Sequence, residues 1–425
     1  MSRSHKLSPT LTILAALMLF FMQGKLLAQT SSISPYSRFG IGDIVPEGFS
    51  IQSGMGGIGA AYFSSTNINF INPACYVADT NAIFDVGARG EIRKISNSER
   101  SNTLNSATFS HLALAFPIKK NKISASFGLL PFSSVGYNVV DIQDTAGLQN
   151  VRYEYQGKGG FNKFYVGTGF NIGKRLSAGV NFSYLFGTIE QIKNVEFPEQ
   201  QFYFSSRYVN GVTVRGFYLN YGLLYNLGVR NGLEWRAGVT GSLSTKVNAE
   251  NNIFYYNYSI SPISGGEIVK DSVVNEQVTR GSIRLPQYVR GGLTVTKPSK
   301  WLLGADFSFY DWSQYENFGS KDPLNNNYGV GIGYERYRES SAYRAGIKYG
   351  TSYLNPKNTE LTEYGVSVGA SFKKSFSKKP PTIISLSVEA GKRGTTDNEL
   401  IGENYFKFTL GITMADIWFI QPRYE

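Results

Sequence analysis

The sequence predicts an all-β fold: a 14-stranded antiparallel transmembrane β-barrel with an N-terminal plug, or hatch, in its lumen. Three observations support this prediction. The N-terminus resembles an export signal, apolar and polar residues alternate over long stretches from residue 82 onward, and long and short connections follow one another in turn. Strands of this kind can cross a bilayer because only alternate side chains face lipid.

Residues 1–28 have the pattern of a secretory signal peptide. Arg3 and Lys6 precede an apolar run that ends at Met22, and Ala28 is the small residue before the expected cut. The run is shorter than the ~20 apolar residues that a spanning helix needs, so a membrane anchor is the less favoured alternative. We therefore expect the mature chain to lie in the outer membrane of a Gram-negative bacterium.

The composition excludes several classes of function. The chain has 28 Tyr, 29 Phe and 46 Gly but only 17% charged residues, which is typical of a transmembrane barrel. After the signal peptide it contains a single cysteine, Cys75, and a single histidine, His111. Intrachain disulfides, Cys/His metal sites and catalytic pairs that need a second histidine are therefore excluded. We expect no enzyme activity, cofactor, metal or nucleic-acid partner, and we interpret both residues as structural.

Residues 29–81 alternate poorly and are rich in glycine, serine, asparagine and proline. Gly54, Gly56 and Gly59 form a literal G-x-G-x-x-G, and Asp79 stands 20 residues after the last glycine. A dinucleotide-binding loop requires a preceding strand and a following helix, and the flanking sequence offers neither. The glycines therefore need another explanation.

We interpret residues 29–81 as a hatch, because a barrel of this size is wider than its own side chains can fill. Glycines allow a compact segment to fold against the inner wall, where larger side chains would not fit. An Asn-Pro pair then turns the chain toward the first strand. The residues expected to form the hatch are Gly54, Gly56, Gly57, Gly59, Asn72, Pro73 and Ala74.

Alternation with a period of two predicts the strands. Between residues 175 and 188, for example, the apolar side chains from Leu176 to Phe186 occupy one face and polar ones such as Asn181 the other. Fourteen segments have this pattern, near 82–92, 106–117, 122–136, 160–172, 175–190, 212–228, 233–248, 281–296, 301–313, 327–337, 341–353, 362–374, 382–392 and 404–414. They define a barrel at 82–414, followed by a periplasmic tail at 415–425.

The connections give an independent check on the barrel. Long ones, expected outside the cell, are near 93–105, 137–159, 191–211, 249–280, 314–326, 354–361 and 393–403, and short ones lie between them. This asymmetry is typical of outer-membrane barrels. A soluble β-sandwich is the alternative, but its strands would be shorter, with turns every 8–12 residues.

Charged residues fall on the polar faces of the strands and are expected in the lumen. They are Asp85, Arg89, Glu91, Lys163, Glu234, Arg236, Arg290, Asp306, Arg344, Lys348, Glu363, Glu389 and Lys407. One interpretation is a set of ion pairs that holds the hatch. The other is that an unpaired cation binds an acidic head group of a ligand, for which Arg290, Arg344 and Lys348 are the candidates.

The third predicted strand contains Pro131, in "FGLLPFSSVGY". Proline cannot donate a ladder hydrogen bond, so within a sheet it marks a bulge, an edge or a break. Gly128 and Pro131 are therefore candidates for a lateral opening in the barrel wall. The alternative is that Pro131 only ends the strand early.

Several motifs resemble those of the FadL family of outer-membrane channels for fatty acids and other hydrophobic compounds. They are "GMGGIGAAY", then "INPA" at 71–74, and "LPQYVRGGLTVTKPSKWLLGADFSFYDWSQY", in which Leu285, Pro286, Gly291, Gly292, Trp301, Asp306 and Trp312 fit the pattern. "YRAGIKY" and "YGVSVGASF" resemble the next two strands. The resemblance implies fourteen strands, an N-terminal hatch and a kinked third strand with a lateral exit.

Two functions follow from these features. The first is a FadL-like channel that passively takes up hydrophobic, fatty-acid-like molecules through a hatch-gated lumen and a lateral opening. The alternative is a non-transporting barrel subunit of an outer-membrane protein secretion or assembly complex, with other outer-membrane or periplasmic proteins as partners. Outer-membrane lipid surrounds the barrel in both cases. The expected external loops 137–159 and 191–211 are polar, unlike the apolar loops that catch fatty acids in the resembling family.

Overall fold

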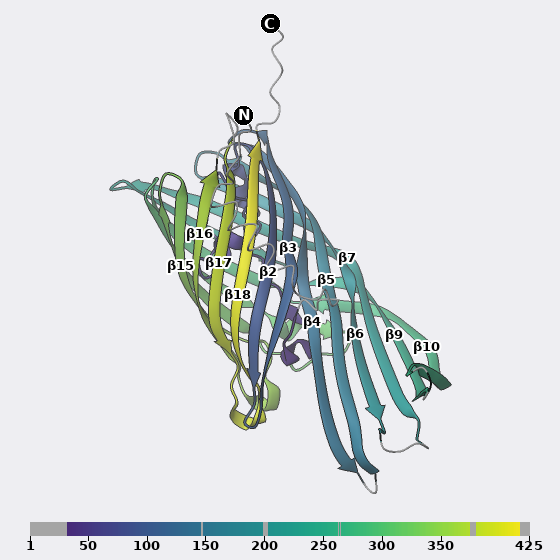
Figure 1. Cartoon of the computed structure of the whole chain (residues 1–425). Coiled ribbons are helices and arrows are strands. Elements are labelled where there is room, and N and C mark those ends of the chain that lie inside the picture. The colour runs from purple at the N-terminus through teal and green to yellow at the C-terminus, as the bar shows by residue number, and fades with distance from the viewer. Residues whose placement is uncertain are drawn as a thin grey trace, which may run out of the picture.

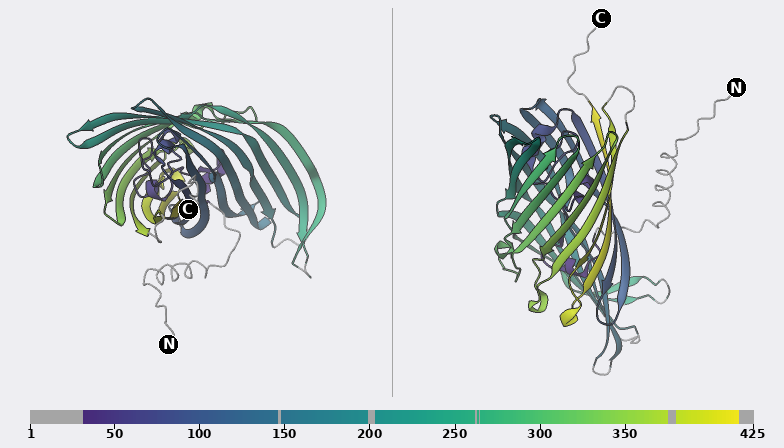
Figure 2. Two further views of the ribbon diagram at one scale, coloured as in Figure 1. Left: turned by 90° about the horizontal axis from the view of Figure 1, so that it is seen from above. Right: turned by 90° about the vertical axis from the view of Figure 1, so that its left-hand side faces the viewer.

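The computed structural model describes residues 32–416, apart from 146–147, 199–202, 262, 264 and 375–379. The expected signal peptide and nearly all of the expected C-terminal tail lie outside this range. The described residues form a closed antiparallel barrel around an N-terminal segment, residues 32–81 (Figures 1 and 2). Among the described residues, no helix is long and apolar enough to cross a membrane.

Fourteen strands form the barrel wall in the described part of the chain. They are β2 (Ala82–Ser96), β3 (Ser101–Lys119), β4 (Ile123–Thr145), β5 (Leu148–Ile172), β6 (Leu176–Glu196), β7 (Ser205–Arg230), β8 (Leu233–Ser242) continued by β9 (Thr245–Ile260), β10 (Glu267–Leu285) continued by β11 (Tyr288–Lys297), β12 (Trp301–Tyr310), β14 (Asn327–Tyr337), β15 (Ser341–Thr351), β16 (Thr362–Lys374), β17 (Thr382–Arg393) and β18 (Gly402–Asp416). Neighbours pair in order, and β18 pairs with β2 to close the barrel. The predicted fold class is confirmed.

The polarity of the two faces of the wall is the reverse of that in a soluble protein. On β6, Phe182 is 51% exposed on the outside, whereas its neighbours Asn181 and Ser183 are fully buried inside. Other strands show the same alternation, with apolar side chains outside and polar ones facing the lumen. An apolar exterior is stable only in lipid, so this pattern supports the membrane barrel over the soluble sandwich.

Several strands are much longer than a bilayer requires. β4 has 23 residues, β5 has 25, β6 has 21 and β7 has 26, whereas about 9–11 residues suffice to span the membrane. Figure 1 shows these strands, with β9 and β10, extending past the rest of the barrel at one end. We call this part the extended sheet. Its strands end at the longer connections, so we refer to this end of the barrel as the loop end.

Longer strands than predicted correct the expected positions of four external loops. Most of the described residues in the segments 93–105, 137–159, 191–211 and 249–280 lie in strands. The reason is that strand pairing continues after the apolar outer face has ended. The β5–β6 register, for example, runs unbroken from Ile172 paired with Leu176 to Arg152 paired with Glu196.

The N-terminal segment crosses the lumen from the loop end to the opposite end, where β2 begins. It contains the 3₁₀ helix η1 (Pro35–Arg38), the two-residue strand β1 (Asp43–Ile44), the short helix α2 (Ser50–Ser53) and the 3₁₀ helix η2 (Pro73–Ala78). Figure 2, viewed along the barrel, shows the segment inside the ring of strands. Two further 3₁₀ helices lie in connections at the loop end: η3 (Trp312–Gln314) and η4 (Pro356–Asn358). The two-residue strand β13 (Glu316–Asn317) follows η3.

Candidate functional site: the filled lumen

Glycine contacts hold residues 54–60 of the N-terminal segment against the inner wall. Gly56 has a φ of 63°, in the left-handed region that favours glycine. The wall opposite is also glycine: a Cβ added to Gly346 of β15 would overlap the backbone nitrogen of Gly56. Similar contacts join Gly333 to Met55. The segment and the wall therefore approach backbone to backbone, as the glycine-rich sequence led us to expect for the segment.

Side chains of the barrel wall accept hydrogen bonds from the backbone N–H groups of residues 56–60. The Asp306 carboxylate on β12 accepts hydrogen bonds from the nitrogens of Gly59 at 2.7 Å and Ala60 at 2.9 Å. Ser367 accepts from the nitrogen of Gly56 at 2.9 Å. Buried backbone groups without partners are costly, so these bonds fix the segment in one position on the wall.

Asn72, Pro73 and Ala74 form the turn at the start of η2. The Asn72 side chain accepts from the nitrogen of Ala74 at 3.0 Å and donates to the carbonyl of Ala60 at 2.5 Å. It also donates to the carbonyl of Leu223 on β7 at 3.1 Å. The predicted hatch residues thus lie inside the barrel against its wall, and Gly57 is the one of the four glycines whose added Cβ would meet nothing within 4 Å.

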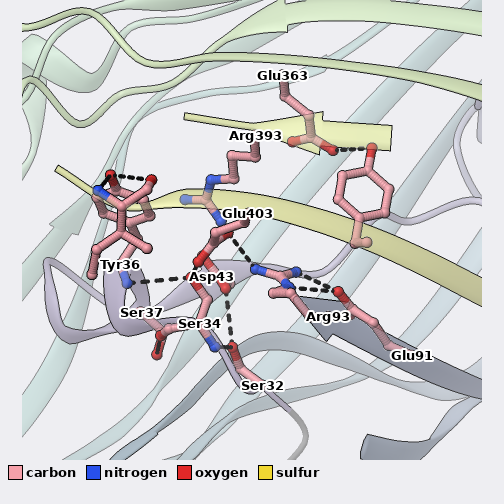
Figure 3. A network of polar contacts seen from close by, with 12 residues as sticks. Ser32, Ser34, Tyr36, Ser37, Asp43, Glu91, Arg93, Glu363, Arg393 and Glu403 are labelled. Carbon is pink, nitrogen blue, oxygen red and sulfur yellow. Dashed lines mark hydrogen bonds and ion pairs between the residues drawn. The ribbon is translucent and has the colours of Figure 1, made fainter. Parts of the chain in front are cut away.

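An ionic network joins the segment to the wall at the loop end (Figure 3). Asp43 of β1 accepts from Arg393 of β17 at 2.8 Å. The Ser34 hydroxyl donates to Glu403 of β18 at 2.5 Å, and Glu403 also pairs with Arg93 of β2 at 2.6 Å. A second pair lies deeper, between Lys163 of β5 and Glu47 of the segment, at 2.5 Å.

The three residues predicted to bind an acidic ligand lie in the lumen, but two of them are already paired. Arg344 contacts Glu335 at 2.6 Å, with side-chain exposures of 3% and 1%. Lys348 pairs with Glu363 at 2.8 Å and with Glu389 at 2.9 Å.

Arg290 differs from those two cations, because no carboxylate lies within 4 Å of it among the described residues. Its guanidinium donates instead to the carbonyl of Gly57 at 3.5 Å. Most lumen charges thus satisfy one another or the segment, which is the first of the two interpretations of the sequence.

Apolar side chains fill the lumen at the loop end. Buried residues of η1 and of the connections at 312–315, 353–361 and 400 pack against inward-facing residues of β4 to β11 in one core. Trp312 stacks on Tyr353 with ring centroids 4.1 Å apart. The connections at the loop end fold inward and pack against η1 of the N-terminal segment.

A cavity of about 380 Å³ remains between the segment and the wall. Its lining includes charged side chains of both signs, among them Arg89, Glu91, Lys348, Glu363, Glu389 and Lys407. Apolar side chains such as Ile44, Val45 and Val330 line the same cavity.

His111 and Cys75 have the structural surroundings that we expected. His111 is buried, with its Nε2 2.8 Å from the Asp85 carboxylate and its ring stacked on Phe49 at 3.7 Å. Cys75 is a free, buried cysteine within η2. Asp79, whose spacing from the glycines matches the ribose-binding carboxylate of a nucleotide site, is 1% exposed near the start of β2. No group of three or more potential metal ligands occurs in the described range.

Sequence reasoning missed several residues of the lumen network. Glu335, Arg93 and Glu403 lie at inward positions, and the same alternation that revealed Arg89 and Lys407 would have identified them. Nothing comparable marks Asp43 or Glu47, because the N-terminal segment has no periodic pattern.

A family model decides the classification of the chain. The model for BamG matches residues 11–425. The chain belongs to the BamG family. No match was found among curated proteins.

Solved structures with the same fold include several FadL-type proteins. A Pseudomonas aeruginosa FadL homologue has a TM-score of 0.63 at 13% identity, over 87% of this chain and 99% of that one. The Pseudomonas putida toluene transporter TodX has a TM-score of 0.61 at 15% identity, over 88% and 99%. The CymD monoaromatic hydrocarbon channel has a TM-score of 0.55 at 14% identity, over 89% and 99%. This BamG-family chain therefore has the fold of FadL-type outer-membrane channels.

Proposed function

We propose that this chain is a non-transporting barrel subunit of an outer-membrane protein assembly or secretion complex. The observation that carries the proposal is the filled lumen. Its loop end is packed with the chain's own apolar side chains, and the remaining cavity is lined by charges of both signs. A hydrophobic molecule would meet this packed end before it reached the cavity, and inside the cavity it would meet charges beside the apolar groups.

The attachment of the N-terminal segment also supports this function. Its hydrogen bonds and ion pairs reach at least six strands, including β12 through Asp306, β16 through Ser367 and β17 through Arg393. A gating motion would break many of these buried contacts together, each contributing about 1 kcal/mol. A permanently seated segment instead suits a barrel that serves as a rigid scaffold, and membership of the BamG family is consistent with that role.

Purification from native membranes tests the proposal. The full-length chain, carrying an affinity tag, is extracted in mild detergent and its co-purifying proteins are quantified. A fixed set of partners in constant ratio to the tagged chain is the expected result. A control barrel of similar abundance, tagged in the same way, must not recover that set. Recovery of this chain alone contradicts the proposal.

The second candidate is the uptake of hydrophobic small molecules, and one observation favours it. β3 and β4 stop pairing at Leu112 and Leu129, next to Gly128 and Pro131, so the wall changes at the predicted lateral opening. A ligand that passed the hatch could leave the barrel into the membrane there. The toluene transporter TodX, with the same fold, is named for such a substrate.

A locked hatch distinguishes this candidate from the first. A Cβ built on Gly54 lies 3.4 Å from the Cβ of Ser387 on β17, close to the separation of a disulfide. The double variant G54C/S387C, with Cys75→Ser, therefore ties the segment to the wall. The uptake candidate predicts that labelled hydrophobic compounds enter liposomes only after reduction of the disulfide. Equal uptake before and after reduction sinks the gating mechanism, and uptake no faster than through empty liposomes sinks transport itself.

A further inference from the structure

The outer half of β4 has a strand edge without a partner. The β3–β4 ladder runs from Lys119 paired with Ile123 only as far as Leu112 paired with Leu129. β4 nevertheless continues to Thr145, hydrogen-bonded to β5 on its other side. Closure of a barrel normally removes such edges, because unpaired backbone groups invite other strands to bind.

The chain itself adds a strand to the beginning of this edge. Asp43 and Ile44 of β1 pair antiparallel with Ser134 and Ser133. The backbone nitrogen of Val45 also donates to the carbonyl of Phe132 at 3.0 Å. The β4 edge is therefore geometrically able to accept an added antiparallel strand.

Beyond β1, the edge is accessible and has the composition of a strand-binding surface. From Asn138 to Asp144, no strand among the described residues pairs with β4 on the side away from β5. Val140 and Ile142 are 43% and 61% exposed on one face. β-branched residues with exposed side chains are a favourable surface for a cross-strand neighbour.

Charge further defines the occupant. Asp141 and Asp144 are exposed, and neither has an ion-pair partner within the described part of the chain. A strand with a lysine or arginine opposite Asp141 would therefore gain a favourable cross-strand pair. A second copy of this chain is a poor occupant, because two antiparallel β4 edges would bring these carboxylates together.

The other edge of the extended sheet is less suitable. The outer part of β10 carries Glu267, Lys270, Asp271 and Arg280, and Glu267 is already paired with Arg207 at 2.7 Å. Charges of both signs on an edge strand discourage strand addition. β10 therefore provides a matched control for β4.

We propose that Asn138–Asp144 of β4 binds an extended strand of another outer-membrane protein by antiparallel β-augmentation. The partner strand has alternating residues, with apolar ones beside Val140 and Ile142 and a basic one opposite Asp141. This mode of recognition takes its affinity from backbone hydrogen bonds and its specificity from alternate side chains. The inference rests on the proposed subunit function, because it requires a partner protein.

Site-specific photo-crosslinking in native membranes tests the contact. A benzophenone amino acid replaces Val140 or Ile142 in the full-length chain, and Val278 on β10 or the outward-facing Val366 on β16 in the controls. We expect an adduct from the β4 positions alone, mapped to a partner segment with alternating apolar residues and a lysine or arginine. An adduct with lipid, with a second copy or with this chain itself overturns the proposal, as does an equal yield from β10.

Proline variants test the backbone hydrogen bonds. Consecutive residues of an antiparallel strand send their N–H groups to opposite sides, so only one of Val139→Pro and Val140→Pro removes a donor from the free edge. That variant should lose about tenfold of the crosslink or partner recovery, while its heat-modifiable barrel remains intact. Asp141→Lys should also reduce recovery, whereas Asp271→Lys on β10 should not.

The outcomes separate the two proposals. If the wild-type chain purifies alone, the subunit function fails and the edge has no partner. If a fixed partner set is recovered and all β4 variants retain it unchanged, the subunit function stands and the edge proposal is wrong. Loss of partner with β4 variants but not β10 variants supports both.

Discussion

Asp306 of β12 accepts a hydrogen bond from the backbone nitrogen of Gly59 at 2.7 Å, which ties the wall of the barrel to the segment inside it. The same carboxylate oxygen accepts from the nitrogen of Ala60. A single wall residue therefore stabilises the glycine turn that sequence analysis singled out.

Replacing Asp306 with alanine should loosen the segment without opening the barrel. Two buried backbone N–H groups lose their acceptor, which should cost about 1–3 kcal/mol for each group that stays unsatisfied. The expected result is faster proteolysis within residues 32–81 and a lower temperature of barrel unfolding on heat-modifiability gels. Glu339→Gln, in an exposed turn, is the control. If Asp306→Ala has the stability and protease resistance of the control, the tie to Gly59 is unimportant.

Gly346→Ala should displace the segment, because the added Cβ would overlap the backbone nitrogen of Gly56. Overpacking of this kind costs about 1–3 kcal/mol. Gly291→Ala on β11 is a matched control, since its Cβ would meet nothing within 4 Å. Melting temperatures of the two variants in the same detergent decide the matter. A smaller or equal loss for Gly346→Ala would show that the segment does not depend on a close approach to the wall.

Removing one member of the buried pair between Arg344 and Glu335 should destabilise the barrel more than removing both. Arg344→Met leaves the Glu335 carboxylate without its cation in an almost inaccessible site, at a cost of about 3–5 kcal/mol. The double variant R344M/E335L should recover much of this loss. A double-mutant cycle of unfolding free energies measures the coupling. Additive effects would mean that the two charges act independently.

Protonation of Asp311, the residue before Trp312, should release Trp312 from the lumen at low pH before the whole barrel unfolds. The Ser313 hydroxyl donates to Asp311 at 2.5 Å and lowers the pKa of that carboxyl below its usual range. Because the folded-state pKa is depressed, this stabilisation is present above the ordinary aspartate pKa of about 3.9 and is lost as pH falls through the lower folded value.

The fluorescence of a variant with Trp312 as its sole tryptophan, followed from about pH 5 to pH 2, should report this release. Asp311→Asn lacks the titrating group and should not show the same transition. An identical acid transition in both proteins would assign the change to other carboxylates.

The sequence allowed the barrel and its inward charges to be predicted for one physical reason: lipid on one side and the lumen on the other impose a strict alternation. Arg344 and Lys348 were placed correctly by this rule. The ion pairs between the wall and the N-terminal segment were not predicted, because pairs such as Lys163–Glu47 join residues more than a hundred positions apart.

The extended sheet escaped prediction for the opposite reason. Beyond the membrane the outer face is no longer required to be apolar, so β5 and β7 continue without the signal that marks their central parts. The path of the N-terminal segment was also inaccessible, because glycine contacts such as Gly56 against Gly346 depend on which strands curve around it.

The composition of the particle that contains this chain in its native membrane tests the central claim most directly. The tagged full-length chain is extracted in mild detergent, and the mass and subunit ratio of the purified particle are measured by native mass spectrometry. The scaffold account predicts a discrete particle in which one copy of this chain is bound to a fixed set of other outer-membrane or periplasmic proteins. A barrel that carries only detergent, lipid or a hydrophobic small molecule would contradict it.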